Sequence, residues 1–194
     1  MSVPQQLRDD PRWARLVDLV RELAFLDGGN DEAFTLASGR TSRWFFDMKP
    51  VMMHPEAGRL VGQLMNVRCD EIGADFVGGL ELGAVPLAAL VVATDFTSER
   101  LGFMVRKQAK GRGGRKTNNP PGIEGASISE GGRVIILEDV TTTGGSAIQA
   151  VKRIEEETSC EVVAVISILD RQEGGKEAFE NAGIAFESLS LIHI

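Results

Sequence analysis

Apolar residues recur every three or four positions between Pro11 and Leu26, and a Gly-Gly pair follows this segment. Such spacing predicts an amphipathic helix that ends before the glycines. A second segment, from Pro55 to Ile72, has the same spacing and predicts a second helix. Between the two, residues 34–50 alternate apolar and polar positions around a Ser-Gly pair, which predicts a hairpin.

After residue 72 the pattern changes to short, continuous apolar runs separated by helical stretches. The apolar runs are "DFVGGL", "LGFMVRK", "RVIILEDV", "EVVAVISILD" and "IAFESLSLI". Runs rich in β-branched residues that alternate with helices are typical of a parallel sheet buried on both faces. We therefore predict an α/β fold, with a mainly parallel twisted sheet and helices on both faces. Residues 109–132 show no periodicity and predict a long loop.

The chain has 194 residues and a formal net charge of -7. We see no internal repeat and no linker, and we expect a single domain over residues 1–194. The negative charge argues against nucleic acid or an anionic membrane as a partner. No apolar run approaches the length of about 20 residues that spans a bilayer, and the polar N-terminus has no signal-peptide core, so we expect a cytoplasmic protein. Cys69 and Cys160 are far apart, outside any metal-binding spacing, and are predicted to be reduced.

The stretch "RVIILEDVTTTGGSA", residues 133–147, carries the clearest chemistry. Glu138 and Asp139 follow a buried strand, and a helix is expected to start near Ser146. Ligands of parallel sheets bind at the carboxyl ends of the strands, and helix N-termini attract anions. The hydroxyls and glycines of residues 141–146 therefore predict a phosphate site.

Two carboxylates beside a phosphate site need a separate explanation. The GxxxxGK[ST] and GxGxxG patterns are both absent here, which disfavours nucleoside triphosphate hydrolysis and dinucleotide binding. The acids could accept hydrogen bonds from the vicinal hydroxyls of a sugar, or hold Mg²⁺ directly or through water. Both alternatives point to a phosphorylated sugar. In a purely structural alternative, the Asp, Thr and Gly residues only cap the helix.

The same stretch resembles the 5-phosphoribosyl 1-pyrophosphate (PRPP) motif of the type I phosphoribosyltransferases: four apolar residues, two acids and a Thr/Gly loop. The resemblance implies that Glu138 and Asp139 hold the ribose hydroxyls, with Asp139 also catalytic. It implies that the loop wraps the 5-phosphate through Val140, Thr141, Thr142, Thr143, Gly144, Gly145 and Ser146. Mg²⁺ would enter as a cofactor with PRPP, either without a direct side-chain ligand or with Glu138 or Asp139 as a ligand through water.

Further stretches are similar to the orotate phosphoribosyltransferases. "FTLASGRTSRWFFD" resembles the segment that covers the pyrimidine in that family, which makes residues 1–50 an N-terminal helix and hood. Phe45 and Phe46 would then pack near the base, although either one could equally be hairpin core. "ILDRQEGG" resembles a motif whose arginine contacts orotate, so Arg171, together with Thr142, is expected to bind orotate. "GGLELGAVPLA" resembles the Gly-rich turn at the pyrophosphate end.

"MVRKQAKGRGG" resembles the segment that leads into the mobile catalytic loop of the family. By position, Arg106, Lys107 and Lys110 are expected to bind PRPP, and our hypothesis is that Lys110 is the main catalytic cation, assisted by Arg112. Seven basic residues and no acidic ones lie between Arg100 and Pro121: Arg100, Arg106, Lys107, Lys110, Arg112, Arg115 and Lys116. Cations around the leaving pyrophosphate would lower the barrier to transfer. Since this loop reaches into the neighbouring subunit in the family, the resemblance also implies a homodimer.

The chain departs from the family pattern at several positions. Arg112 and Gly114 replace a histidine and an acid, and Ala37 and Gly83 stand where lysine sometimes occurs. An arginine can neutralise pyrophosphate but cannot donate a proton near neutral pH. The resemblance implies transfer of phosphoribose from PRPP to orotate, giving orotidine 5-monophosphate and pyrophosphate. Two alternatives are transfer to a purine or another base, and a non-catalytic PRPP sensor that binds RNA.

Overall fold

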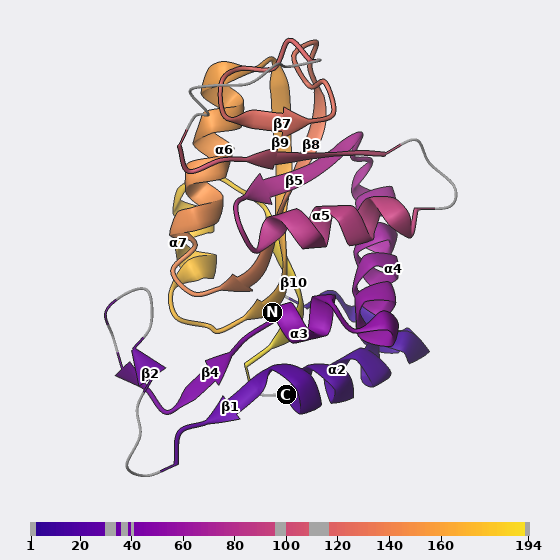
Figure 1. The fold of residues 1–194 in the computed structure, drawn as a ribbon, viewed down its shortest axis with the longest axis vertical. Helices are drawn as coiled ribbons and strands as arrows, with labels where there is room; N and C mark the ends of the chain where they lie inside the picture. Colours follow the sequence, from indigo (N-terminus) through magenta and orange to yellow (C-terminus); the bar gives the residue numbers. More distant parts are fainter. Residues whose placement is uncertain are drawn as a thin grey trace.

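The computed structural model describes residues 3–29, 34–35, 39, 41–95, 100–108 and 117–192. Its centre is a six-stranded sheet in the order β10-β9-β8-β5-β6-β7 (Figure 1). The strands are β5 (Phe76–Leu80), β6 (Leu101–Val105), β7 (Ile123–Gly125), β8 (Gly132–Thr141), β9 (Cys160–Asp170) and β10 (Phe186–Leu191). All neighbours are parallel except β6 and β7. The predicted mainly parallel sheet is confirmed.

Helices pack on both faces of this sheet, as predicted. One face is covered by α2 (Pro11–Ala24), α4 (Pro55–Ile72) and α5 (Ala84–Ala93), whose buried side chains share one core cluster. The other face is covered by α6 (Gly145–Glu157) and α7 (Gly175–Asn181), which belong to a second cluster. Two short helices, α1 (Gln5–Asp9) and α3 (Lys49–Met52), complete the helical elements of the described residues.

The strand order reverses between β5 and β8. From β5 the chain adds β6 and β7 on one side, and it then returns to place β8, β9 and β10 on the other side. The carboxyl ends of β5 and β8 therefore lie side by side at a topological switch point, where ligands of open α/β sheets bind. This topology places the Gly-rich turn after β5 next to the acidic pair of β8.

Helix α4 has the bounds that its periodicity predicts, because both of its ends carry capping residues. The His54 Nδ1 atom accepts a hydrogen bond from the Ala57 N–H at 3.3 Å. At the other end Gly73 adopts a left-handed conformation with φ 76°, which a side chain would disfavour. None of the described helices is long and apolar enough to cross a membrane.

The N-terminal region differs from its prediction in two respects. The first long helix ends at Ala24, and the next residues form β1 (Phe25–Asp27), which pairs with β4 (Trp44–Phe46). Phe25 leaves the helix because its ring packs against Phe46, with the ring centroids 5.3 Å apart. The predicted hairpin is a separate, shorter pair of β2 (Phe34–Thr35) and β3 (Thr41–Ser42).

Two predictions for the basic region need correction. Residues 109–132 contain β7, which was missed because three residues are too few to show a period. Arg100 is not part of a basic surface, since its side chain is 2% exposed. Its guanidinium bonds to Asp70 at 2.7 Å, to Asp95 at 3.1 Å and to Asn66 at 2.6 Å. Arg100 is therefore a buried structural cation that joins α4 to the start of β6.

Candidate active site

The Thr-Gly loop, residues 141–146, connects β8 to α6 as predicted. With Glu138 and Val140 it lines a cavity of about 160 Å³. Gly144 has φ 78°, and an added Cβ there would lie 2.9 Å from the Phe179 ring, so this position requires glycine. The Thr141 hydroxyl oxygen is buried and makes no hydrogen bond within the described residues. A buried hydroxyl without a partner beside a helix N-terminus fits an anionic ligand that would complete its bonding.

Glu138 and Asp139 lie in the last part of β8, which continues to Thr141 and so ends later than predicted. Glu138 faces the cavity of the Thr-Gly loop. The Asp139 carboxylate lies against the Gly-rich turn, residues 78–83. A Cβ added at Gly83 would be only 2.5 Å from the Asp139 carboxyl carbon. A lysine at position 83 would therefore collide with Asp139 in this conformation. Glu138 and Asp139 are placed between the cavity and the turn.

Burial and the neighbouring Asp139 carboxylate raise the pKa of Glu138 to about 8, although Lys107 opposes this effect. The carboxylate form is therefore unfavourable until a hydrogen-bond donor or a cation approaches it. Vicinal hydroxyls and Mg²⁺ are groups of this kind. Because Lys107 affects this pKa, its ammonium group also lies within electrostatic reach of the site.

Substituting Glu138 with glutamine is expected to stabilise the ligand-free protein at high pH. Between the ordinary pKa of 4.5 and about 8, the folded protein keeps a proton that the unfolded chain loses. The free energy of unfolding therefore falls as the pH rises through this window. Above pH 8, Glu138→Gln should exceed the wild type by about 1 to 3 kcal/mol. Urea unfolding at pH 5 and pH 8.5 measures this, with exposed Glu156→Gln as control; equal pH dependence in all three proteins would contradict the prediction.

The Gly-rich turn is tied to the end of β6. The Glu81 N–H donates to the Val105 carbonyl at 2.7 Å, and the Lys107 N–H donates to Glu81 Oε1 at 2.7 Å. Arg106 turns towards β7, where its Nη1 lies 3.4 Å from Glu124 Oε1. Lys107 is exposed and Arg106 partly exposed, beside the turn. Lys110 and Arg112 lie outside the described residues.

Arg171 joins the sheet to the hood. Its side chain is 3% exposed, and its Nε donates to Glu173 Oε1 at 2.7 Å. Its Nη1 and Nη2 donate to the Trp44 carbonyl and the Ser42 hydroxyl, both at 3.2 Å. Its backbone N–H donates to the Thr141 carbonyl at 2.9 Å. Arg171 is thus placed between the Thr-Gly loop and the hood.

The two hood phenylalanines have different surroundings. Phe46 is 5% exposed and belongs to the core beside Phe25. Phe45 is partly exposed, and its ring centroid lies 5.6 Å from that of Phe34. Neighbouring residues of a strand point to opposite faces, so the two rings cannot both face one ligand. The packing leaves Phe45, and not Phe46, as the candidate for the base site.

Comparison with known proteins shows which family this chain is similar to. A family model described as "Phosphoribosyl transferase domain" matches residues 52–186. The orotate phosphoribosyltransferase of Rhodopseudomonas palustris (strain BisB5) is 42% identical over 181 residues, covering 91% of each chain. The chain belongs to the orotate phosphoribosyltransferase family.

Solved structures of the family have the same fold. The orotate phosphoribosyltransferase of Mycobacterium tuberculosis, in complex with Fe(III) dicitrate, superposes with a TM-score of 0.79 and 34% identity. The match covers 94% of this chain and 98% of that one. A structure of that enzyme in complex with PRPP superposes with a TM-score of 0.76 and 32% identity, over the same shares of the two chains. The type I phosphoribosyltransferase fold, predicted from the PRPP motif, is confirmed.

Relative to this family, sequence reasoning missed two residues that position the site. Glu81 holds the Gly-rich turn to Lys107, and Glu173 pairs with Arg171. Glu173 lies only two positions after Arg171 in "DRQE", so the sequence offered a signal for it. The sequence offered no signal for Glu81, because Lys107, the residue that bonds to it, lies 26 positions further along the chain.

Proposed function

We propose that this protein transfers the 5-phosphoribosyl group from PRPP to orotate, forming orotidine 5-monophosphate and pyrophosphate in pyrimidine (UMP) biosynthesis. The observation that carries the proposal is the pairing of Glu138 and Asp139 with the Thr-Gly loop at the switch point of the sheet. An anion site beside two carboxylates suits a sugar phosphate, with its phosphate in the loop and its hydroxyls at the acids. Residues 1–194 would act as one catalytic domain, with residues 1–50 as the hood. The cytoplasmic location stays a prediction from the sequence.

Each part of PRPP and orotate has a proposed partner. The 5-phosphate binds Val140 and residues 141–146, while the ribose hydroxyls bind Glu138 and Asp139. Arg106 and Lys107 bind pyrophosphate beside the Gly-rich turn. Orotate lies between the Thr-Gly loop and the hood and contacts Thr142, Arg171 and Phe45. The buried guanidinium of Arg171 supports this assignment, because orotate carries a carboxylate.

The transfer exchanges two bonds at the anomeric carbon. The C–O bond to pyrophosphate breaks with its electron pair on the leaving oxygen, while a ring nitrogen of orotate bonds to the carbon and releases its proton to water. Negative charge grows on pyrophosphate as the sugar becomes oxocarbenium-like, so cations that contact pyrophosphate favour the transition state. Lys110 and Arg112 supply these cations in our proposal. Arg112 acts only through its charge, since it keeps its proton near neutral pH.

Magnesium fits the site as a partner of PRPP. Burial and the neighbouring Asp139 raise the pKa of Glu138, which supports the proposal because a cation or hydroxyls would stabilise this carboxylate pair. The described residues contain no cluster of three or more His, Cys, Asp or Glu side chains that could hold a metal by themselves. Glu138 or Asp139, through water, would therefore hold Mg²⁺ together with the ligand. When bound, Mg²⁺ would neutralise the pyrophosphate oxygens.

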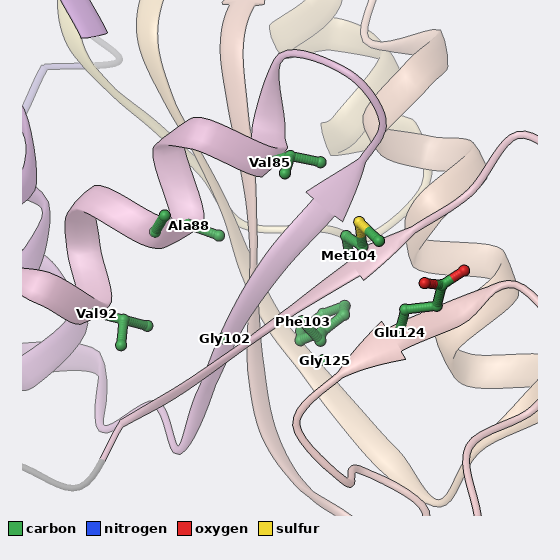
Figure 2. Close-up of a pocket in the computed structure, with 9 residues that line it drawn as sticks. Val85, Ala88, Val92, Gly102, Phe103, Met104, Glu124 and Gly125 are labelled. Carbon is green, nitrogen blue, oxygen red and sulfur yellow. The ribbon is translucent and has the colours of Figure 1, made fainter. Parts of the chain in front are cut away.

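An apolar face at the edge of the sheet supports assembly as a homodimer. All ten residues of α5 are apolar, but only Ala84, Leu87, Ala88 and Val91 are buried. The outer side of α5 and the β6–β7 edge line a cavity of about 300 Å³, shown in Figure 2 with Val85, Val92 and Met104. A helix that is apolar all round is normally buried, so a second copy of the chain would cover this face.

Substituting Ala89 with aspartate is expected to break this dimer. Ala89 is exposed on α5 and lines the apolar cavity, so a charge there is tolerated by one chain but not by an interface. Light scattering should give twice the chain mass of 20.9 kDa for the wild type and about one chain mass for Ala89→Asp. The same change at exposed Ala182, which directly follows α7, should leave the dimer intact. A wild-type monomer at micromolar concentration would contradict the prediction.

The proposed function is tested by following the absorbance of orotate with PRPP and Mg²⁺. We expect orotate to be consumed, and uracil, adenine and hypoxanthine to be left unchanged. Consumption of another base without orotate would overturn the choice of acceptor but not of donor. No reaction with any base would favour the non-catalytic alternative, which a gel shift with RNA then tests.

A further inference from the structure

The turn between β9 and α7 contains an unusual backbone conformation. Among the described residues, Gln172 is the one non-glycine residue with a positive φ, of 55°. Glycine, and to a lesser degree asparagine and aspartate, adopt this left-handed region readily, but a side chain such as that of glutamine disfavours it. The Gln172 side chain is exposed, so packing of the side chain does not hold it there. The conformation must therefore be imposed by the backbone on either side.

Three hydrogen bonds fix the chain around Gln172. Its own N–H donates to Asp170 Oδ1 at 2.8 Å, and Asp170 is 1% exposed. The Arg171 N–H donates to the Thr141 carbonyl, at the end of β8, at 2.9 Å. The Ile192 N–H, directly after β10, donates to the Asp170 carbonyl at 3.0 Å. The turn is thus tied to the ends of both strands that flank β9, and strained conformations persist where the surrounding structure holds them in this way.

The left-handed residue turns the chain directly beside the proposed orotate site. The residues on either side of it, Arg171 and Glu173, bond through Nε and Oε1 at 2.7 Å, and their side chains are 3% and 16% exposed. The chain then enters α7 with little room for another path. A Cβ added at Gly175 would collide with the Thr141 methyl group and lie 2.8 Å from the Thr142 carbonyl oxygen. The left-handed residue therefore decides where the Arg171 guanidinium and its carboxylate partner lie.

We propose that Gln172 is a positioning residue for orotate binding, and that it acts through its left-handed backbone and not through its side chain. The conformation directs the Arg171 guanidinium towards Glu173 and the hood, so that the cation is held in place before orotate binds. The role in orotate binding rests on the proposed function. The placement of Arg171 does not, and it can be measured without any reaction.

The kinetic test compares substitutions that differ in how well they tolerate a positive φ. Valine tolerates it poorly because it is branched at Cβ, whereas glycine and asparagine tolerate it well. Gln172→Val should lower kcat/KM for orotate about 10-fold, mainly through KM, while the KM for PRPP changes less than about threefold. Gln172→Asn and Gln172→Gly should stay within about threefold of the wild type. The control is Gln149→Val, the same substitution at an exposed position of α6, which should leave the kinetics unchanged.

Two kinetic outcomes would overturn the positioning role. An unchanged kcat/KM in Gln172→Val would show that the surrounding bonds place Arg171 whichever residue stands at position 172. An equal loss in Gln172→Asn and Gln172→Gly would show that the glutamine side chain, and not the backbone, carries the effect.

A double substitution separates positioning from a general loss of structure. If Gln172 acts through Arg171, then adding Gln172→Val to Arg171→Ala should lower kcat/KM for orotate less than about twofold further. A full additional loss, as large as in the wild-type background, would overturn the proposal, because Gln172 would then act by another route.

Nuclear magnetic resonance tests the placement whether or not the wild type turns over orotate. The Arg171 Nε–H is buried and bonded to Glu173, so it should exchange slowly with water in the ligand-free protein. Its exchange should be at least about fivefold faster in Gln172→Val than in Gln149→Val, and unchanged in Gln172→Asn. Equal exchange in the two valine variants would overturn the placement. Faster exchange in a protein without orotate transfer would mean that the proposed function fails while the placement holds.

Discussion

Replacing Lys110 with alanine is expected to lower kcat for orotate about 10²- to 10³-fold, the loss typical of removing one group that stabilises a charged transition state. Negative charge on pyrophosphate is greatest in the transition state, so kcat should fall more than PRPP affinity. Steady-state kinetics with PRPP varied at saturating orotate measure the two effects separately.

The control for this result is Lys152→Ala, which removes an exposed lysine from α6. It should keep wild-type kinetics, and the thermal midpoints of both variants should lie within about 2 °C of the wild type. Near wild-type turnover in Lys110→Ala would reject Lys110 as the catalytic cation. If Lys152→Ala also lowered kcat strongly, the effect of Lys110→Ala would be assigned to the change in the overall charge of the protein and not to the position of Lys110.

Replacing Arg171 with alanine should lower kcat/KM for orotate by about 10- to 100-fold, because hydrogen bonds to charged groups contribute about 1.5 to 3 kcal/mol. The substitution removes the proposed contact to the orotate carboxylate. It also removes the bonds from Arg171 to Trp44 and Ser42, so the hood loses its link to β9. The KM for PRPP should change less than threefold, since the Thr-Gly loop is bonded to the backbone of residue 171 and not to its side chain.

Two further variants sharpen this test. Arg171→Lys should recover little activity, because one ammonium group cannot replace three donors that point in different directions. Glu173→Gln keeps the guanidinium but removes its carboxylate partner, and it should lower kcat/KM less than Arg171→Ala. An equal loss of PRPP and orotate binding in Arg171→Ala would assign Arg171 to the fold of the site and not to orotate.

Arg171 contacts both the hood and the proposed orotate site, so these two parts of the protein depend on each other. Its guanidinium is already bonded to Glu173 and the hood in the ligand-free protein. Orotate would therefore meet a cation that is held in place, and little side-chain freedom would be lost on binding.

The local parts of the fold and site could be read from the sequence. The bounds of α4 followed from its periodicity, and the structure shows that His54 and Gly73 cap its two ends. The Thr-Gly loop and the start of α6 near Ser146 followed in the same way from one continuous stretch, although β8 continues to Thr141, beyond the predicted strand end.

The sequence alone therefore determined the five parallel strands, their alternation with helices and the motif of a PRPP site, since each is encoded over a few neighbouring residues. The tertiary structure decided which side chains meet across the chain: Arg100 in a buried ion-pair network, Phe46 in the core, and Arg171 on Ser42, 129 positions away. It also decided the raised pKa of Glu138. These depend on burial and on distances between remote segments, and local periodicity carries no information about either.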